Sequence, residues 1–286
     1  MIKLCAFADE AGEALDVQIA ALKRNGISLI ELRNVNGKNV ADLTDEEAVA
    51  CYEKLKENGI SVWSVGSPLG KVKLADAEDH MAKVRRVCEL AGLLHTKKIR
   101  MFSFLEANED GDTVKRYLKK MVEIANEYGV LMHHENEKGI YGDTLSHVLD
   151  LVDANIEGLQ FVFDPANFIQ CGEMIDEALD ALFDKTAYFH IKDVERATGQ
   201  LVPAGHGNGE IALMAERIAA SARDAVMTLE PHLKVFAGYA QIDDTEMKTK
   251  FTYATQDESF DAAANALKAV LASVGYKENE KGEFVK

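Results

Sequence analysis

The sequence predicts a single (β/α)8 TIM barrel, and two observations lead to this fold. The segment Leu-Lys-x-Asn-Gly-Ile-Ser occurs at residues 22–28 and again at 55–61, and in each copy a glycine suited to the end of a helix precedes an apolar run. Short apolar runs also alternate with amphipathic helical patterns along all 286 residues, a length close to the roughly 250 residues that this fold usually has. Repeated strand–helix units of this kind indicate a β/α architecture.

The strands are expected where apolar runs have no polar face, because parallel strands are buried on both sides. In chain order these runs are residues 3–8, 28–34, 61–67, 98–104, 130–136, 159–165, 187–193 and 225–230. Helical periodicity predicts helices at residues 14–25, 44–58, 76–93, 112–128, 144–153, 173–184, 209–222 and 258–275. Thr44 followed by three acidic residues has the pattern of a capping box at the start of the second helix.

The domain organisation follows from the same pattern. No linker interrupts it, so residues 1–276 are expected to form one domain and the charged residues 277–286 a loose tail. An open, doubly wound sheet is the structural alternative. It would favour Gly-x-Gly-x-x-Gly after the first strand, whereas this chain continues there as Ala-Phe-Ala-Asp-Glu.

Composition and charge exclude several classes of protein. With 47% hydrophobic and 28% charged residues, the chain has the composition of a packed globule. Its 32 basic and 48 acidic residues give a net charge of −16, which argues against a nucleic-acid partner. No apolar run has the length of a membrane span, no signal-peptide pattern opens the chain, and the four cysteines show no Cys-x-x-Cys spacing. We therefore expect a cytoplasmic enzyme without a membrane partner, and we leave open whether it is a homo-oligomer.

Chemistry in a TIM barrel lies at the carboxyl ends of the strands, and four consecutive expected strands end in residue types that bind metals. They are Glu135, Asp164, His190 and Glu230. Burying such side chains unpaired would be costly, whereas a cation would offset the repulsion of three carboxylates. Any one of them alone is more often a helix N-cap or a solvated charge, but four in succession indicate a shared site. This oxygen-rich set without thiols favours Mn²⁺, Mg²⁺ or Co²⁺ over a structural zinc.

The fifth expected strand also holds rival candidates. Alternation puts His133 and Glu135 on one face and His134 on the other, although a twist at the strand end would exchange them, and Glu137 follows closely. His134 is therefore kept as a candidate substrate contact.

Four motifs resemble those of the xylose-isomerase-like superfamily of sugar phosphate isomerases and epimerases. They are Glu-Asn at 135–136, Asp-Pro-Ala-Asn at 164–167, His-Ile-Lys-Asp at 190–193 and Leu-Glu-Pro-His at 229–232. The resemblance covers nearly the whole chain and implies a TIM barrel with one divalent cation held by Glu135, Asp164, His190 and Glu230. Of the divalent cations, we expect Mn²⁺ first, with Mg²⁺, Co²⁺ or Zn²⁺ as alternatives. The resemblance also implies that Glu135 and Glu230 act as acid and base.

The chemistry that the resemblance implies is proton transfer beside a carbonyl. A metal-bound ketose or keto-sugar, phosphorylated or not, would lose a proton to one glutamate, form an enediolate and regain a proton from the other. The chain departs from the family at Asn167, where a histidine is common, and at His206, where an acidic residue is frequent. Arg196 holds the place of an arginine that often binds substrate.

Other polar residues near the strand ends are candidate substrate contacts. The full set is Arg33, Lys71, Arg100, His134, Asn167, Lys192 and Arg196. The loop at residues 66–71 could hold a phosphate with its backbone N–H groups and Lys71, or it could be a simple turn with a surface lysine. Arg33 and Arg100 could equally form ion pairs inside the barrel with Glu31 or Glu106.

Other functions remain open at this stage. A dehydratase of a keto-sugar or keto-inositol, or a lyase that cleaves C-glycosides, would use the same metal and base but expel a leaving group. An abasic-site endonuclease needs further metal ligands and a basic groove, which the net charge of −16 disfavours. A non-catalytic sugar-binding protein would keep the pocket without needing both glutamates at the metal.

Overall fold

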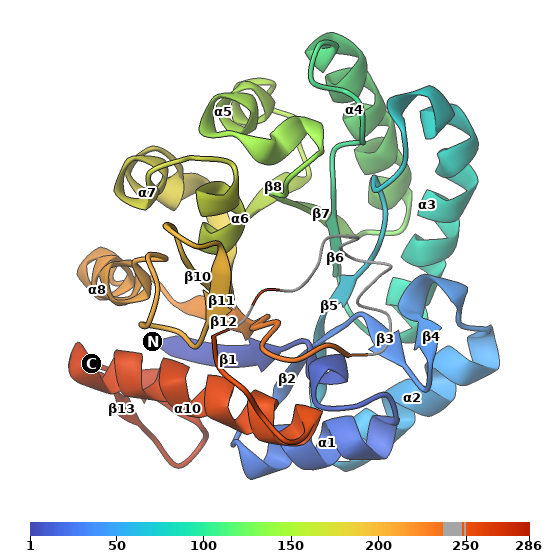
Figure 1. Cartoon of the computed structure of the whole chain (residues 1–286). Helices are drawn as coiled ribbons and strands as arrows, with labels where there is room; N and C mark the ends of the chain where they lie inside the picture. The colour runs from blue at the N-terminus through green and yellow to red at the C-terminus, as the bar shows by residue number, and fades with distance from the viewer. Residues whose placement is uncertain (237–247, 249) are drawn as a thin grey trace.

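Eight parallel strands close into a barrel in the computed structural model, which describes residues 1–236, 248 and 250–286 (Figure 1). The strands are β1 (Ile2–Ala6), β2 (Leu29–Leu32), β5 (Ser61–Gly66), β6 (Lys98–Met101), β7 (Leu131–Glu135), β8 (Leu159–Phe163), β9 (Thr186–Ile191) and β12 (Ala225–Leu229). Each pairs with the next in the chain, and β12 returns to β1 with Ile2 opposite Ala225. The predicted (β/α)8 barrel is therefore confirmed.

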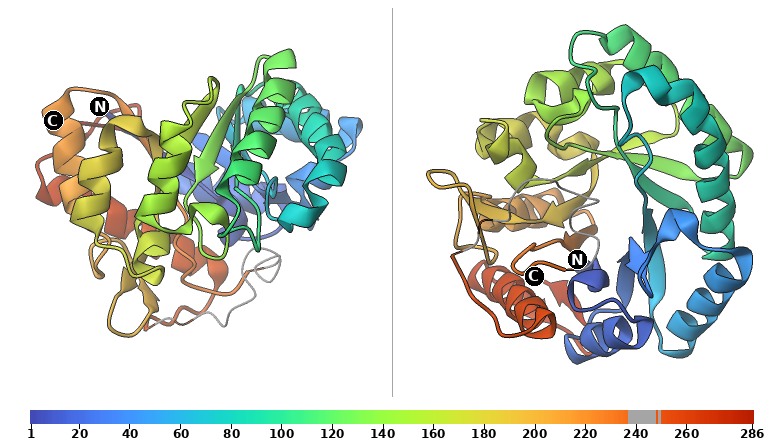
Figure 2. Two further views of the ribbon diagram at one scale, coloured as in Figure 1. Left: turned by 90° about the horizontal axis from the view of Figure 1, so that it is seen from above. Right: turned by 45° about the vertical axis from the view of Figure 1, so that its right-hand side comes forward.

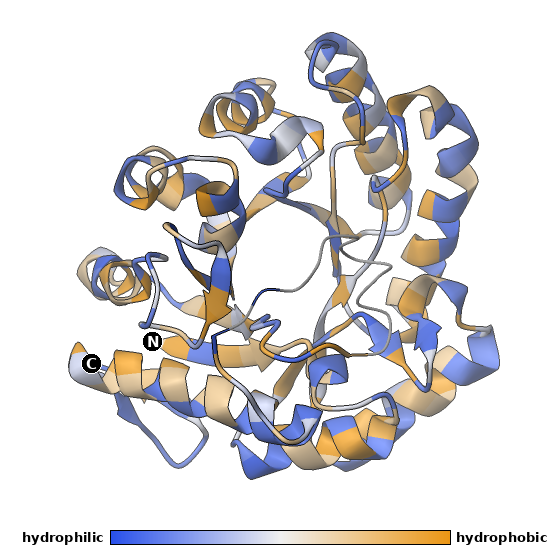
Figure 3. Ribbon diagram, in the orientation of Figure 1, coloured by the Kyte–Doolittle hydropathy of each residue, from blue (hydrophilic) through white to orange (hydrophobic). Residues whose placement is uncertain are grey.

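Helices surround the barrel and turn their apolar faces toward it, as the hydropathy colouring in Figure 3 shows. They are α1 (Leu15–Arg24), α2 (Asp45–Glu57), α3 (Ala77–Leu93), α4 (Gly111–Glu127), α5 (Leu145–Asp153), α7 (Ile175–Leu182), α8 (Ile211–Ser221) and α10 (Gln256–Ser273). The capping box at Thr44 and Glu47 is present. Gly26 and Gly59 have φ of +66° and +72°, so the repeated motif ends its helices in the left-handed conformation that favours glycine. Among the described residues, no helix is long and apolar enough to cross a membrane.

The last helix completes the ring. Helix α10 lies beside α1 in Figures 1 and 2. Arg24 of α1 holds it there through ion pairs of 2.6 Å to Asp257 and 2.8 Å to Asp261. The first and last units of the barrel therefore pack on each other as neighbouring units do elsewhere.

The core has two parts. The larger part lies between the strands and the helices. The smaller part lies inside the barrel and consists of Cys5, Val162, Tyr188 and Val226. Tyr188 belongs to the same strand face as His190, because side chains two residues apart in a strand point the same way. The interior of the barrel is thus apolar in its middle, below the polar strand ends.

Several short elements lie outside the expected pattern. They are α6 (Pro165–Gln170) and the two hairpins β3 (Asn34–Val35) with β4 (Lys38–Asn39) and β10 (Asp193–Glu195) with β11 (Gln200–Val202). All of them follow the carboxyl ends of barrel strands. Helix α6 begins at Pro165, a residue suited to the first turn of a helix, but six residues are too few to show helical periodicity.

The expectation of a loose tail at residues 277–286 is wrong. Strands β13 (Lys277–Glu278) and β14 (Glu283–Val285) form a hairpin, and β14 pairs antiparallel with β1, with Phe284 opposite Ile2. Phe284 is buried. The pairing is possible because β2 joins β1 only from Cys5 onward, which leaves the start of β1 with an open edge on that side. The high charge of this segment therefore does not indicate that it is unstructured.

Candidate active site

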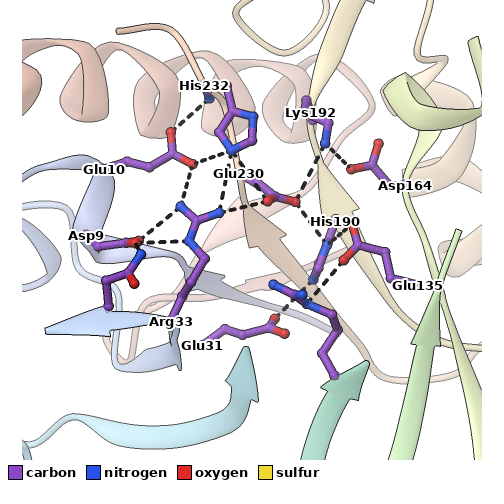
Figure 4. Close-up of polar contacts among 12 residues, drawn as sticks. Asp9, Glu10, Glu31, Arg33, Glu135, Asp164, His190, Lys192, Glu230 and His232 are labelled. Carbon is purple, nitrogen blue, oxygen red and sulfur yellow. Dashed lines mark hydrogen bonds and ion pairs between the residues drawn. The ribbon is translucent and has the colours of Figure 1, made fainter. Parts of the chain in front are cut away.

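Four side chains from four adjacent strands meet at the carboxyl end of the barrel. Glu135 ends β7, Asp164 and Glu230 directly follow β8 and β12, and His190 lies near the end of β9. One ligand atom from each residue lies within 4.8 Å of the others, and all four residues are buried. Figure 4 shows the four side chains turned toward one another. The structure therefore brings together the four residues that the sequence placed in one site.

Local structure fixes the direction of the Asp164 carboxylate. Its Oδ1 accepts the backbone N–H of Asn167 at 3.0 Å, so Asp164 is the N-cap of α6. The side chain of Asn136 joins the ends of β7 and β8 by two bonds of 2.8 Å to the backbone N–H and carbonyl of Asp164. The helix-cap alternative thus holds for one oxygen of Asp164. The second oxygen, Oδ2, turns toward the cluster.

The donor atoms fit a hard divalent cation. Oδ2 of Asp164, Oε2 of Glu230 and Nδ1 of His190 are buried, and their partners among the described residues are the charged groups of the cluster and Lys192. Nδ1 of His190 lies 3.0 Å from Oε1 of Glu135 and 3.1 Å from Oε2 of Glu230. Ligands about 2.1 Å from an octahedral cation are about 3 Å from their neighbours, so these separations suit one ion. Three carboxylates and one imidazole are also the ligand types that Mn²⁺ or Mg²⁺ accepts.

The electrostatics of the cluster hold two of these groups in their charged forms. Burial alone would lower the pKa of His190, but the carboxylates of Glu135 and Glu31 outweigh it and raise the pKa well above its usual range. Burial would raise the pKa of Glu230, but Lys192 and His190 hold it well below its usual range. Without a cation, the imidazolium of His190 balances the carboxylates together with Lys192, Arg100 and Arg33.

Asp164 behaves differently from Glu230. Burial raises the pKa of Asp164 to about 7, against the lowering effect of Lys192, whose Nζ lies 3.0 Å from Oδ2. The carboxylates of Glu230 and Glu135 add to the rise. A cation at this place would remove that mutual repulsion, which is a further sign that the ligand set suits one.

Four of the candidate substrate contacts touch the cluster directly: Asn167, Arg100, Lys192 and, through a larger network, Arg33. Asn167 donates from Nδ2 to Oε1 of Glu135 at 3.3 Å, and Nε of Arg100 lies 3.2 Å from Oε2 of the same carboxylate. Lys192 lies between Asp164 and Glu230. Asn167 therefore lies beside the cluster. Arg100 pairs with Glu135 rather than with Glu31 or Glu106.

Arg33 is held by a network that sequence analysis missed. Its guanidinium contacts Glu230 at 2.9 Å, Asp9 at 2.9 Å and Glu10 at 3.3 Å. It also lies over the ring of Phe7, 4.3 Å from the ring centroid. Arg33 therefore forms ion pairs inside the barrel, as one alternative predicted, but with Asp9, Glu10 and Glu230 rather than with Glu31 or Glu106. Burial raises the pKa of Glu10 to about 8. Asp9 and Glu10 directly follow the expected first strand at residues 3–8, and this position was the sequence signal that could have placed them near the site.

Lys71 lies at the rim. Its Nζ is 3.1 Å from Oε2 of Glu137 and 4.7 Å from the ring centroid of Phe102. A cavity of about 180 Å³ lies beside this loop, and Lys71, Arg33, Arg100 and Phe102 are among the residues that line it. Arg33 and Arg100 connect it to the cluster through their contacts with Glu230 and Glu135.

Two of the candidates lie away from the cluster. The ring of His134 faces the helices, where Nε2 is 2.7 Å from the hydroxyl of Ser103 and the ring packs against Phe161. Strand alternation thus holds to the end of β7. Arg196 is exposed and its guanidinium donates to the backbone carbonyl of Glu173.

Two further buried carboxylates were not predicted to have partners near the strand ends: Glu31 supports His190, and Asp193 holds a loop. Nε2 of His190 lies 3.2 Å from Oε2 of Glu31, and the hydroxyl of Tyr188 donates to the other oxygen of Glu31 at 2.8 Å. Asp193 accepts backbone N–H groups from Val194 and from three glycines of the loop at residues 203–209. The glycines were visible in the sequence, but the carboxylate that gathers them was not.

Comparison with known proteins gives one family and a common fold. The family model for xylose isomerase-like TIM barrels matches residues 19–249. An L-ribulose 3-epimerase has a TM-score of 0.72 at 17% identity, covering 96% of this chain and 95% of its own. A D-psicose 3-epimerase crystallised in the presence of D-fructose gives 0.72 at 16% identity, with coverage of 96% and 99%. A probable 3-DHS dehydratase, AsbF from Bacillus anthracis, gives 0.68 at 16% identity, with coverage of 94% and 99%. The comparison with curated protein sequences gives no match. At these identities the solved structures support the fold alone.

Proposed function

The chain belongs to the xylose isomerase-like TIM barrel family, and we propose that it is a divalent-metal-dependent isomerase or epimerase of a ketose or keto-sugar. The observation that carries the proposal is the pair of buried glutamates, Glu135 and Glu230, which reach the same imidazole of His190 from two different strands. The similar solved structures include two sugar 3-epimerases, which supports a sugar substrate.

We propose that Glu135, Asp164, His190 and Glu230 hold the cation, Mn²⁺ first among the hard divalent ions. Such an ion would draw electrons from the carbonyl and neighbouring hydroxyl of a bound sugar and so acidify the C–H bond between them. The four free cysteines, Cys5, Cys51, Cys88 and Cys171, suit a reducing compartment, and we place the protein in the cytoplasm.

The two glutamates would move the proton. Glu230 stays ionised because Lys192 and His190 lower its pKa, so it can accept a proton from substrate carbon. Glu135 approaches from β7, which β8 and β9 separate from β12, and in its protonated form would return a proton from the other side. Delivery to the same carbon on its opposite face gives an epimer, and delivery to the neighbouring carbon gives an isomer. Asn167 and Arg100 hold the Glu135 carboxylate for this transfer.

The cavity beside the cluster would take the rest of the sugar. Arg33, Lys71 and Arg100 border it, and they supply donors for hydroxyl groups or for a phosphate. Arg33 and Arg100 already pair with carboxylates, so they can position a sugar hydroxyl without leaving an uncompensated charge. Lys71, at the rim, is the candidate contact for a phosphorylated end.

The experiment is product analysis in D₂O. The protein is stripped of metal with a chelator, reloaded with Mn²⁺ and incubated with ketoses and keto-sugars, free and phosphorylated, and the products are followed by NMR and mass spectrometry. We expect a new sugar isomer or epimer that carries one deuterium on carbon. Apart from this exchange of hydrogen for deuterium, its mass should equal that of the substrate. A product that has lost water would assign the chain to the dehydratases, and no carbon-bound deuterium in any product would contradict the proposal.

A further inference from the structure

A second cavity lies at the opposite end of the barrel from the metal cluster. It has a volume of about 410 Å³, which is within the range of small-molecule pockets. Its walls come from the amino-terminal parts of the strands: Lys98 opens β6, and Gln160 and Tyr188 lie near the starts of β8 and β9. Tyr188 precedes His190 by two residues, so the cavity extends from the amino-terminal strand ends to one layer of side chains below the cluster. This space is therefore distinct from the proposed active site.

One wall of this cavity carries an unpaired positive charge. Lys98 is half-buried, and its Nζ lies 4.0 Å from the ring centroid of Trp63. No carboxylate of the described part of the chain forms an ion pair with Lys98, although most other buried or half-buried cations of this acidic protein have one. Burial lowers the pKa of Lys98, as expected for an ammonium group without a counter-charge.

The other charged residues of the cavity wall, Asp184 and Lys185, offset each other, which leaves Lys98 as its net positive charge. His133 is fully buried, and its Nε2 lies 2.9 Å from Oε1 of Gln160. A single net positive charge matches one carboxylate better than a phosphate dianion.

The opposite wall is apolar. Leu151, Ile156, Leu159 and Phe161 line it, from the end of α5 through the start of β8. The ring of Tyr188 meets that of Trp63 edge to face, with 6.0 Å between their centroids. A ligand here would therefore place a flat or aliphatic body against carbon and its charged end at Lys98.

We propose that this cavity is a binding site for a small organic carboxylate with an apolar body, held by the ammonium of Lys98 beside the ring of Trp63. The site does not depend on the chemistry proposed at the metal cluster. Tyr188 is common to both regions, because it borders the cavity and donates to Glu31 behind His190. For that reason Tyr188 is left unchanged in the test.

Trp63 is the single tryptophan of the chain, so its fluorescence reports on this cavity alone. The full chain is titrated with benzoate, phenyl phosphate and benzyl alcohol, which share a ring and differ in charge. We expect a saturable change with benzoate, a weaker response to phenyl phosphate and the weakest to benzyl alcohol. Lys98→Met should weaken benzoate binding about tenfold or more, since it removes the counter-charge but keeps the side-chain length. Lys97→Met, at an exposed neighbour outside the cavity, is the matched control and should bind as the unchanged protein does.

A second variant guards against loss of folding in the first. Ile156→Phe fills the apolar wall, keeps Lys98 and should also weaken benzoate binding. The proposal is overturned if benzoate gives no saturable change in the unchanged protein, if Lys98→Met binds it equally well, or if benzyl alcohol or phenyl phosphate binds more tightly. Because the readout is binding at Trp63, this result is independent of whether the chain proves to be a sugar isomerase.

Discussion

Nε2 of His190 lies 3.2 Å from Oε2 of Glu31, on the far side of the imidazole from the metal cluster. The hydroxyl of Tyr188 donates to the other oxygen of Glu31, so this carboxylate is itself held in place. An N–H that donates to a buried carboxylate fixes both the orientation and the tautomer of a metal-binding imidazole. Glu31 thereby presents Nδ1 of His190 to Glu135, Glu230 and the expected cation.

Replacing this carboxylate should weaken the metal site. Glu31→Gln keeps the shape of the side chain but removes the charge that supports His190, and we expect Mn²⁺ affinity to fall about 10- to 100-fold. Isothermal titration calorimetry on the metal-free protein measures this directly. Glu46→Gln, on the exposed face of α2, is the control. Unchanged affinity in Glu31→Gln would mean that His190 needs no such support.

The carboxylate of Asp193 should contribute to stability rather than to metal binding. It accepts the backbone N–H groups of Val194, Gly205, Gly207 and Gly209 at 2.8–3.0 Å. In Asp193→Asn the amide NH₂ faces two of these donors, and we expect a loss of about 2–4 kcal/mol in the free energy of unfolding. Urea unfolding compares it with Asp153→Asn, an exposed control on α5. If Asp193→Asn loses no more unfolding free energy than the control, the conformation of the glycine loop does not depend on this carboxylate.

Acid should destabilise the fold partly through His80. Its Nε2 accepts the backbone N–H of Gly70 at 3.1 Å, and burial, with Lys83 nearby, lowers the pKa of His80 from 6.5 to about 4. The unfolded chain therefore binds a proton more readily than the fold does, and stability falls as the pH drops from about 6.5 to about 4.

His80→Gln tests this contribution, since glutamine can accept the same N–H without titrating. Between pH 7 and pH 4.5 we expect the unchanged protein to lose about 2 kcal/mol more unfolding free energy than the variant does. His206→Gln changes an exposed histidine and should lose as much as the unchanged protein. Equal pH dependence in all three proteins would exclude His80 as the cause.

The C-terminal hairpin should be part of the stable fold. Ending the chain after residue 276 removes the pairing of β14 with β1 and exposes the surface that Phe284 covers. We expect this truncation to cost about 2–4 kcal/mol of unfolding free energy. A chain that lacks only Lys286 serves as the control. If the longer truncation unfolds at the same urea concentration as the control, the hairpin contributes nothing to the stability of the fold.

Strand ends were predictable because each barrel unit carries its own local signal. Gly26 and Gly59 mark where helices end, and the apolar runs after them mark strands, so the ranges of the eight strands follow without knowledge of tertiary contacts. The same rule placed Glu135, Asp164, His190 and Glu230 at one end of the barrel, where the structure has them.

The partners of those residues were not predictable in the same way. Glu31 and His190 are 159 residues apart, and their contact depends on interior faces that meet across the barrel. The position of His134 depended on strand alternation, which the sequence analysis stated but did not apply to its choice of substrate contacts. Arg33 illustrates a third reason: a buried arginine takes the nearest carboxylates, and Asp9 and Glu10 come close only once β1 and β2 are adjacent.

The central claim is that Glu135 and Glu230 transfer protons at a metal-bound sugar. Deuterium uptake from D₂O into the carbon next to the carbonyl tests it most directly, measured by NMR at equal, independently determined Mn²⁺ occupancy. Glu46→Gln again serves as the control. We expect Glu135→Gln and Glu230→Gln each to slow the conversion of the sugar at least about 100-fold, and at least one of them to slow exchange as strongly. Exchange at the rate of the unchanged protein in both fully metal-loaded variants would contradict the account and move the base to another residue, with Lys192 the nearest.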